Sequence, residues 1–204
     1  MTLFSNATGF VGKLMGILIL ITLSSNSYGE TWSQSFGLDP YHSLEVDSGI
    51  LDYVVTGVGV RAEGGRITTL RIQGREILEN GELGPRRMFY FGRSPQHALE
   101  VWYEAGPYQV ITGLGFRAVP GNVTTMDVEV SQYFDDSMEV EYLKRVRVGR
   151  DPNHSLEVYA STLDTTSDPR KTVLSGLGLR EYNGKYDDDE ALFSIVGLVS
   201  DDPL

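Results

Sequence analysis

Three histidines stand at the same place in three copies of one phrase, and they are the first candidates for chemistry in this chain. His42, His97 and His154 lie 55 and 57 residues apart, and each precedes a small residue, leucine, glutamate and valine. Three imidazoles gathered on one axis could bind zinc, with water as the fourth ligand. Because each histidine follows a proline at the start of a predicted strand, we expect a structural role, in which each bonds a loop carbonyl of its own repeat. A shared metal and a contact to a ligand are the alternatives, and we predict no metal or cofactor.

A second candidate site is a short aromatic segment in the middle copy. It contains the residues Trp102, Tyr103, Glu104 and Tyr108. A tryptophan that points outward beside a carboxylate can stack on a sugar ring while the carboxylate accepts hydrogen bonds from the hydroxyls. The sequence therefore predicts a ligand-binding site at these four residues. The alternative is an aromatic cluster that covers the edge of the core or contacts another chain.

A second repeated phrase follows the first in each copy, so the chain is built from three similar units. It has the pattern Thr/Ser-Gly-x-Gly-x-Arg and begins at Thr56, Thr112 and Ser175. Two copies match the dinucleotide-binding pattern Gly-x-Gly-x-x-Ala, but that motif requires a following helix. Here a turn and another strand follow, so we expect the glycines to relieve crowding at a bulge or beside a neighbouring strand.

Alternation of apolar and polar residues predicts four strands per unit and about twelve strands in all. In the middle unit we expect strands at 88–91, 97–103, 109–118 and 123–134, and the next unit opens at 143–148. The last unit ends after a strand at 192–199. We expect residues 31–36 at the amino terminus to supply the strand that this unit lacks, which would also remove a free sheet edge.

Three units of this length with long strands predict an all-β, three-fold pseudo-symmetric β-prism, with a β-trefoil as the alternative. Residues 188–195 read Asp-Asp-Glu-Ala-Leu-Phe-Ser-Ile. This segment is similar to a strand motif of the vitelline membrane outer layer protein family, and the layout more loosely resembles the jacalin-type lectins. The resemblance covers residues 30–204 and implies a β-prism with an oligosaccharide connection. The chain departs from the vitelline family in having no cysteine.

The strand period also predicts which side chains face the core. Val58 and Val60 have the inward parity, and Gly57, Gly59 and Arg61 the outward one. The repeated glutamates and arginines would then meet on the outer faces as cross-strand ion pairs. The expected pairs are Glu45 with Arg61, Glu100 with Arg117, and Glu157 with Arg180.

The amino-terminal 29 residues have the layout of a secretory signal peptide, with an apolar core too short to span a membrane. We therefore expect a secreted or periplasmic protein without membrane insertion after cleavage. The remainder, 30–204, is expected to be one domain, with units at about 38–92, 93–149 and 150–204 and with 30–37 completing the last. The formal net charge of −11 disfavours nucleic acid as a partner.

These features predict a non-catalytic module that binds glycan or a cell-surface polymer. No cysteine nucleophile or serine elbow is present, and every histidine belongs to the repeat, so we expect no enzymatic activity. A structural envelope or coat protein that acts through contacts between chains, including oligomers, is the alternative. A glycoside-modifying enzyme that uses two of the 28 acidic residues is the second alternative.

Overall fold

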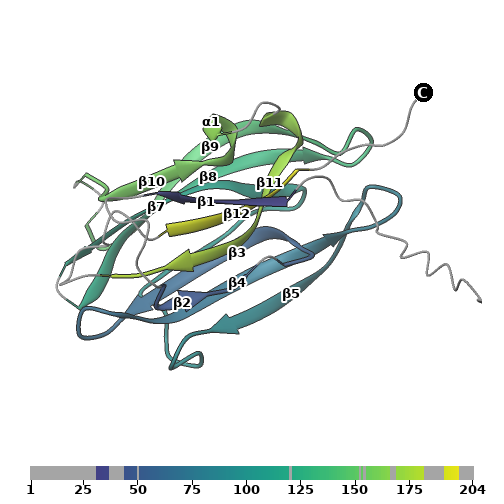
Figure 1. Ribbon diagram of the computed structural model, residues 1–204. Helices are drawn as coiled ribbons and strands as arrows, with labels where there is room; N and C mark the ends of the chain where they lie inside the picture. Colours follow the sequence, from purple (N-terminus) through teal and green to yellow (C-terminus); the bar gives the residue numbers. More distant parts are fainter. Residues whose placement is uncertain are drawn as a thin grey trace, which may run out of the picture.

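The chain forms three four-stranded antiparallel sheets around a common interior (Figure 1). The computed structural model describes residues 31–36, 44–49, 51–119, 121–151, 153, 155–165, 169–181 and 191–197. Twelve strands lie in this part of the chain. The predicted signal peptide at 1–29, His42 and His154 lie outside the described residues.

Two of the sheets are each made from one continuous stretch of chain. The first sheet has the order β5-β4-β3-β6 and the second has the order β10-β7-β8-β9. The strands of the first sheet are β3 (Val54–Ala62), β4 (Ile67–Ile77), β5 (Leu83–Phe91) and β6 (Val101–Glu104). Those of the second are β7 (Gln109–Val119), β8 (Asn122–Phe134), β9 (Glu139–Gly149) and β10 (Val158–Ser161).

The third sheet joins the two ends of the chain. Its order is β1-β12-β11-β2, from strands β1 (Thr31–Phe36), β2 (Val46–Asp47), β11 (Thr172–Leu179) and β12 (Ala191–Gly197). Figure 1 shows β1 beside β12, and Thr31 is in register with Val196. The expectation that residues 31–36 pair with the last strand is therefore confirmed, and β2 adds a second amino-terminal strand by pairing with β11.

The core lies where the equivalent strands β3, β7 and β11 contact one another. Val58, Leu114 and Leu177 occupy the same position in the three repeated phrases, and all three are fully buried. This is the inward parity that the sequence predicts for β3. An all-β prism with a three-fold repeat is thus confirmed in place of the trefoil, because three separate four-stranded sheets share one apolar interior.

A bulge interrupts each of these three central strands at the residue before the first glycine. The register shifts at Thr56, Thr112 and Ser175, between the residues on either side of each. The backbone carbonyls of the bulged Thr56 and Ser175 accept hydrogen bonds from Ala105 and Leu51, which follow β6 and β2. The expectation that the Gly-x-Gly phrases lie at bulges is confirmed.

One predicted strand is shorter than expected. β6 begins at Val101, whereas the alternation predicts a strand from His97. The His97 amide donates to the Ser94 carbonyl, which closes a turn around Pro95 and keeps this stretch out of the sheet. Among the described residues, no helix has the length and apolar character needed to cross a bilayer.

Candidate functional site

Trp102 lies flat on the outer face of the first sheet, over two positions that have no side chain. β6 pairs with β3 so that Trp102 is opposite Gly59 and Glu104 is opposite Gly57. A Cβ atom on Gly59 would approach Trp102 Cε3 to 2.6 Å, and one on Gly57 would approach Trp102 Cη2 to 3.1 Å. The glycine pair thus forms a seat for the indole, and the Trp102 residue stays half-buried.

The neighbouring strands place polar and apolar side chains beside this ring. Through the β3–β4 and β4–β5 registers, Arg71 and Tyr90 continue the row of Trp102, and Gln73 and Met88 continue the row of Glu104. We call this surface the Trp102 face, defined by the residues Arg71, Gln73, Met88, Tyr90, Trp102 and Glu104. Tyr90 is 45 % exposed and Met88 is 39 % exposed.

The polar groups of the Trp102 face are held in place from below and from the side. Gln73 is buried and accepts a hydrogen bond of 3.0 Å from the bulged Thr56. Arg71 donates to the carbonyls of Pro95 and His97 in the loop before β6 and lies 5.4 Å from the centre of the Tyr90 ring. Glu104 forms an ion pair with Arg86 at one end of the face.

The equivalent face of the second sheet uses its polar groups internally. Asp127 is buried and paired with Arg145 and Arg147. Glu129 accepts hydrogen bonds from three hydroxyl groups, those of Thr112 at 3.0 Å, Tyr159 at 2.7 Å and Ser161 at 2.6 Å. The guanidinium of Arg145 covers the Tyr159 ring at 3.7 Å. This face therefore offers a ligand fewer uncommitted groups than the Trp102 face does.

The four residues of the predicted site do not share one surface. Trp102 and Glu104 lie together on the outer face, as their common parity requires. Tyr103 points inward and packs against the core, and burial raises the pKa of its hydroxyl. Tyr108 is 51 % exposed and lies in the turn between β6 and β7 with a φ of 54°.

Tyr90, Arg71 and Met88 were missed because they are brought to Trp102 by pairing between strands. The signal for them was present in β5, where Arg86, Met88 and Tyr90 alternate with the more buried Phe89. That alternation shows which residues face outward, but the sequence alone does not show which of them share a row with Trp102.

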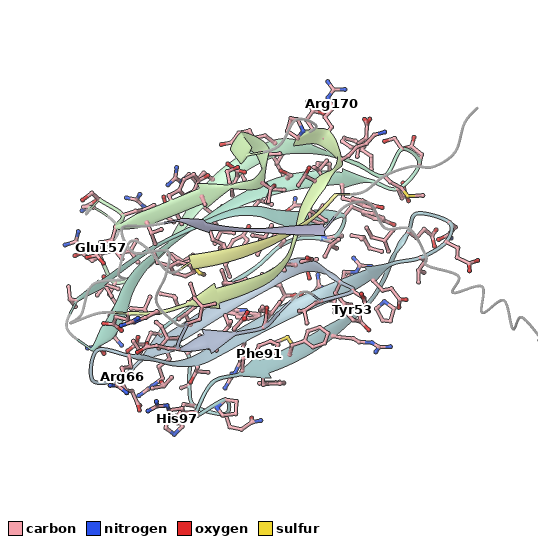
Figure 2. All side chains as sticks on the ribbon, in the orientation of Figure 1. Tyr53, Arg66, Phe91, His97, Glu157 and Arg170 are labelled. Atoms are coloured by element: carbon pink, nitrogen blue, oxygen red, sulfur yellow. The ribbon has the colours of Figure 1, made fainter. Side chains whose placement is uncertain are left out.

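His97 lies at the edge of the first sheet and points away from the interior (Figure 2). Its side chain is 54 % exposed, and its Nδ1 is 3.5 Å from a carboxylate oxygen of Glu63. The prediction that it bonds a loop carbonyl is wrong, because the turn at 94–97 turns the ring outward. No cluster of metal-ligating side chains occurs within the described ranges.

The repeated glutamates hold adjacent sheets together at one end of the prism. Glu100 accepts hydrogen bonds from the backbone amides of Ala62 in the first sheet and Val123 in the second, at 3.1 and 2.6 Å. Glu45 does the same for Glu181, which follows β11 of the third sheet, and Ile67 in the first, at 3.3 and 2.6 Å.

The expected ion pairs of Glu45 with Arg61 and Glu100 with Arg117 are therefore wrong. The two carboxylates are committed to backbone amides, while Arg61 pairs with Glu63 at 2.7 Å and Arg117 donates to the Ser155 carbonyl. In the third set, Glu157 faces the Ala118 amide at 3.5 Å, which follows the same pattern.

Glu181 breaks the symmetry at this end, where the first two sheets have Ala62 and Ala118. Its residue is only 2 % exposed, and neither carboxylate oxygen makes a hydrogen bond within the described part of the chain. The pKa of Glu181 is raised to about 7: burial is the largest cause, the backbone of Gly121 opposes it, and the charges of Glu45, Glu100 and Glu157 add smaller increases. Glu181 is thus a buried acid with no counter-charge among the described residues, which no sequence motif indicated.

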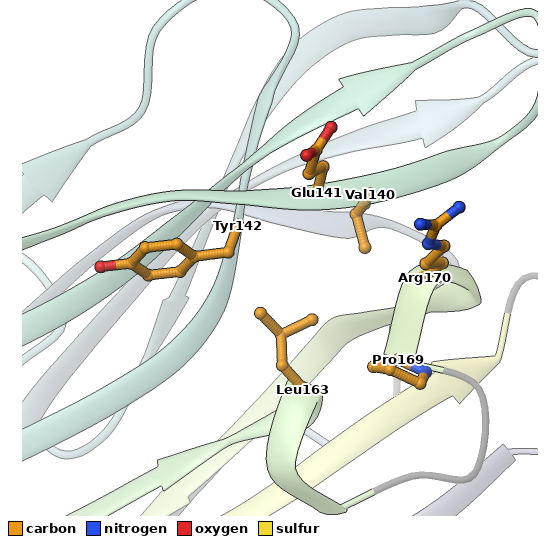
Figure 3. A pocket seen from close by; sticks show the side chains of 6 residues that line it. All are labelled: Val140, Glu141, Tyr142, Leu163, Pro169 and Arg170. Atoms are coloured by element: carbon orange, nitrogen blue, oxygen red, sulfur yellow. The ribbon is translucent and has the colours of Figure 1, made fainter.

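The longer loop of the third unit forms a shallow pocket against β9 (Figure 3). This loop contains α1 (Thr162–Thr165) and η1 (Pro169–Lys171). The pocket has a volume of about 240 Å³ and is lined by Val140, Glu141, Tyr142, Leu163, Pro169 and Arg170. It is open and mainly apolar, with few groups that could orient a polar ligand.

Comparisons with known proteins find fold relatives only. No family model and no curated protein matches the chain. A variant of Malaysian banana lectin is 10% identical and covers 83% of this chain and 100% of its own, with a TM-score of 0.38. A mannose-specific jacalin-related lectin from Morus nigra, solved with mannose, is 10% identical over 82% of this chain and 96% of its own (TM-score 0.38).

The insecticidal crystal protein Cry7Ca1 of Bacillus thuringiensis is 9% identical and matches 83% of this chain with 35% of its own (TM-score 0.44). None of these likenesses bears on which residues of this chain would bind a ligand. The predicted resemblance to the vitelline membrane family stays a prediction. The chain is an all-β protein with the β-prism fold, in which three four-stranded sheets share one interior.

Proposed function

We propose that this protein is a non-catalytic module that binds glycan or a cell-surface polymer through the Trp102 face. The observation that carries the proposal is the half-buried indole seated on Gly57 and Gly59, with Glu104 on the same face. An indole fixed in this way offers apolar area to the C–H groups of a sugar ring at low entropic cost. Arg71 and the Glu104–Arg86 pair supply donors and an acceptor for its hydroxyls.

The binding role is favoured over catalysis by the state of the carboxylates. Asp127 and Glu129, the buried acids on the second sheet, are held by guanidinium groups and by hydroxyls. General acid–base chemistry on a glycosidic bond needs one carboxyl with a raised pKa beside a second, ionised one, both open to substrate. Glu181 has the raised pKa but is enclosed. We also propose export from the cytoplasm, from the layout of residues 1–29, which the mass of the mature chain would test.

Replacing Trp102 with alanine is expected to weaken binding to a soluble polysaccharide by about tenfold or more, the scale typical of a buried aromatic anchor. Tyr90→Ala should weaken it less, because Tyr90 lies at the margin of the face. Phe134→Ala is the matched control, since Phe134 is also an exposed aromatic, at 40 %, but lies at the end of β8. Affinity electrophoresis in pectate, alginate and mannan gels measures the effect.

A thermal melt of each variant establishes that it is folded, and Trp102→Phe serves if the alanine variant is not. If the wild type is retarded in the gel and both Trp102→Ala and Phe134→Ala are retarded to the same extent as the wild type, the result would contradict the Trp102 face as the binding site. No retardation by any of the three polymers, together with a concentration-dependent oligomer, would favour the structural-protein alternative.

A further inference from the structure

We infer that the Trp102 face takes a negatively charged sugar residue, such as a uronate or a sulfated sugar, in preference to a neutral one. The inference rests on the proposed function and names the class of ligand for the same site. Its basis is a group of three guanidinium side chains, Arg71 on this face and Arg75 and Arg86 beside it, which share one paired carboxylate, Glu104, among the described residues.

The three arginines lie on one side of β4 and β5. Arg71 is in register with Tyr90, and Arg75 is in register with Arg86 four residues further along each strand. Within the described ranges, the one carboxylate paired with this set is Glu104, through Arg86. In a chain with a formal net charge of −11, this face carries an excess of positive charge.

Arg71 and Arg75 are held by uncharged groups. Arg71 donates from Nε and Nη2 to the carbonyls of Pro95 and His97, at 3.1 and 2.5 Å. Arg75 donates in the same way to the carbonyls of Gly84 and Leu83, at 2.6 and 2.5 Å. Carbonyls fix a guanidinium without cancelling its charge, so both side chains are oriented in advance for an anion.

The second sheet shows the contrasting arrangement. There Arg145 and Arg147 occupy the outward positions of β9, and both pair with the buried carboxylate of Asp127. Asp127 lies opposite β7 in the second sheet. The residue at the equivalent position of the first sheet, opposite β3, is Arg71. On the second sheet the carboxylate of Asp127 therefore offsets the charge of the arginines, whereas the Trp102 face has no carboxylate at the corresponding position.

The like charges on the Trp102 face also repel one another. Partial burial lowers the pKa of the Arg75 guanidinium, and the positive charge of Arg86 lowers it further. An anion that bridges Arg75 and Arg86 would relieve this repulsion and could form bidentate hydrogen bonds with the guanidinium groups. A carboxylate or sulfate attached to a sugar ring stacked on Trp102 supplies that anion.

Titration calorimetry with tri-galacturonate and its methyl ester tests the inference, because the two probes share one sugar backbone and differ in charge. At physiological ionic strength we expect the acid to bind about tenfold more tightly than the ester. Dextran sulfate and dextran form a second matched pair, which separates a sulfate ligand from a carboxylate one. A single-stranded oligonucleotide tests whether the face binds any polyanion, whatever its chemical backbone.

The substitution Glu104→Gln tests whether removing a negative charge from the face strengthens or weakens binding. Removing this carboxylate raises the positive charge of the face, so the acidic probe should bind roughly two- to fivefold more tightly, the range for exposed charge pairs. If Glu104 instead accepts hydrogen bonds from the hydroxyls of a neutral sugar, the same substitution weakens binding. Glu141→Gln is the control, since it changes the net charge equally but lies on β9.

Preference for the charged member of either pair, with tighter binding by Glu104→Gln and not by Glu141→Gln, would support the inference. Equal binding of charged and neutral members would overturn it and leave the proposed function in place. Equally tight binding of the oligonucleotide would also overturn it. Binding of no probe would overturn both the inference and the proposed function.

Discussion

Replacing Glu181 with glutamine is expected to raise the free energy of unfolding by about 2 kcal/mol at pH 8 and to leave it nearly unchanged at pH 4. Burial is the largest cause of the raised pKa, the backbone of Gly121 opposes it, and the charges of Glu45, Glu100 and Glu157 add smaller increases. The pKa of about 7 lies well above the value of 4.5 in an unfolded chain. That difference corresponds to about 3 kcal/mol, and residual hydration of the carboxyl lowers it to about 2.

The direction of the pH dependence follows from which state holds the proton. Between pH 4.5 and about 7 the folded protein keeps the Glu181 proton that the unfolded chain has released. The wild type therefore loses stability as the pH rises through this window and loses no more from this group above it. Glutamine cannot ionise, so the loss disappears in the variant.

Urea denaturation of wild type and Glu181→Gln at pH 4, 6 and 8 measures this difference directly. Glu181→Ala is a useful companion, because alanine is the residue at the same place in the other two sheets, Ala62 and Ala118. A difference in stability that is the same at all three pH values would contradict the account of Glu181 as a buried acid without a counter-charge.

Placing a methyl group under Trp102 is expected to weaken ligand binding and also to destabilise the fold. In Gly59→Ala the new Cβ would lie 2.4 Å from Leu99 Cδ1, 2.6 Å from Trp102 Cε3 and 2.9 Å from the Val101 carbonyl. The Leu99 side chain and the indole must therefore both shift. Overpacking of this kind costs about 1–3 kcal/mol, and loss of the fixed ring should lower affinity by about tenfold or more.

Gly115→Ala is the matched control, because Gly115 has the same place on the second sheet. Its Cβ would lie 2.6 Å from Leu156 Cδ1 and 2.8 Å from Tyr159 Cδ2. We expect a similar loss of stability in the two variants, measured by denaturant melts, but a loss of polysaccharide binding only in Gly59→Ala. Parallel loss of binding in both would show that the effect comes from general destabilisation and not from the Trp102 face.

The fold was predictable because the sequence repeats its own signals. Three copies of the Thr/Ser-Gly-x-Gly-x-Arg phrase indicated three equivalent strands, and parity placed Val58 and Val60 correctly in the core. The missing strand of the last unit pointed to residues 31–36, which pair with β12. These are local patterns, and a local pattern is enough when the same unit is used three times.

The site was predictable only in part, because its members meet across strands. Parity alone placed Trp102 and Glu104 on one face and should have excluded Tyr103, which is one residue out of phase. The neighbours Arg71 and Tyr90 depend on the registers of β3 with β4 and of β4 with β5, which bulges shift by one residue. The ion pairs expected for Glu45 and Glu100 failed for a related reason, since backbone amides of adjacent sheets took both carboxylates.

The fluorescence of Trp102 tests the central claim most directly, namely that ligand lies on the indole seated over Gly57 and Gly59. The chain has two tryptophans, Trp32 and Trp102, so the variant Trp32→Phe leaves Trp102 as the only indole emitter. Titration of this variant with an acidic oligosaccharide should produce a saturable change in emission with the same dissociation constant that calorimetry gives. Binding seen by calorimetry with no change in Trp102 emission would place the ligand elsewhere and contradict the account.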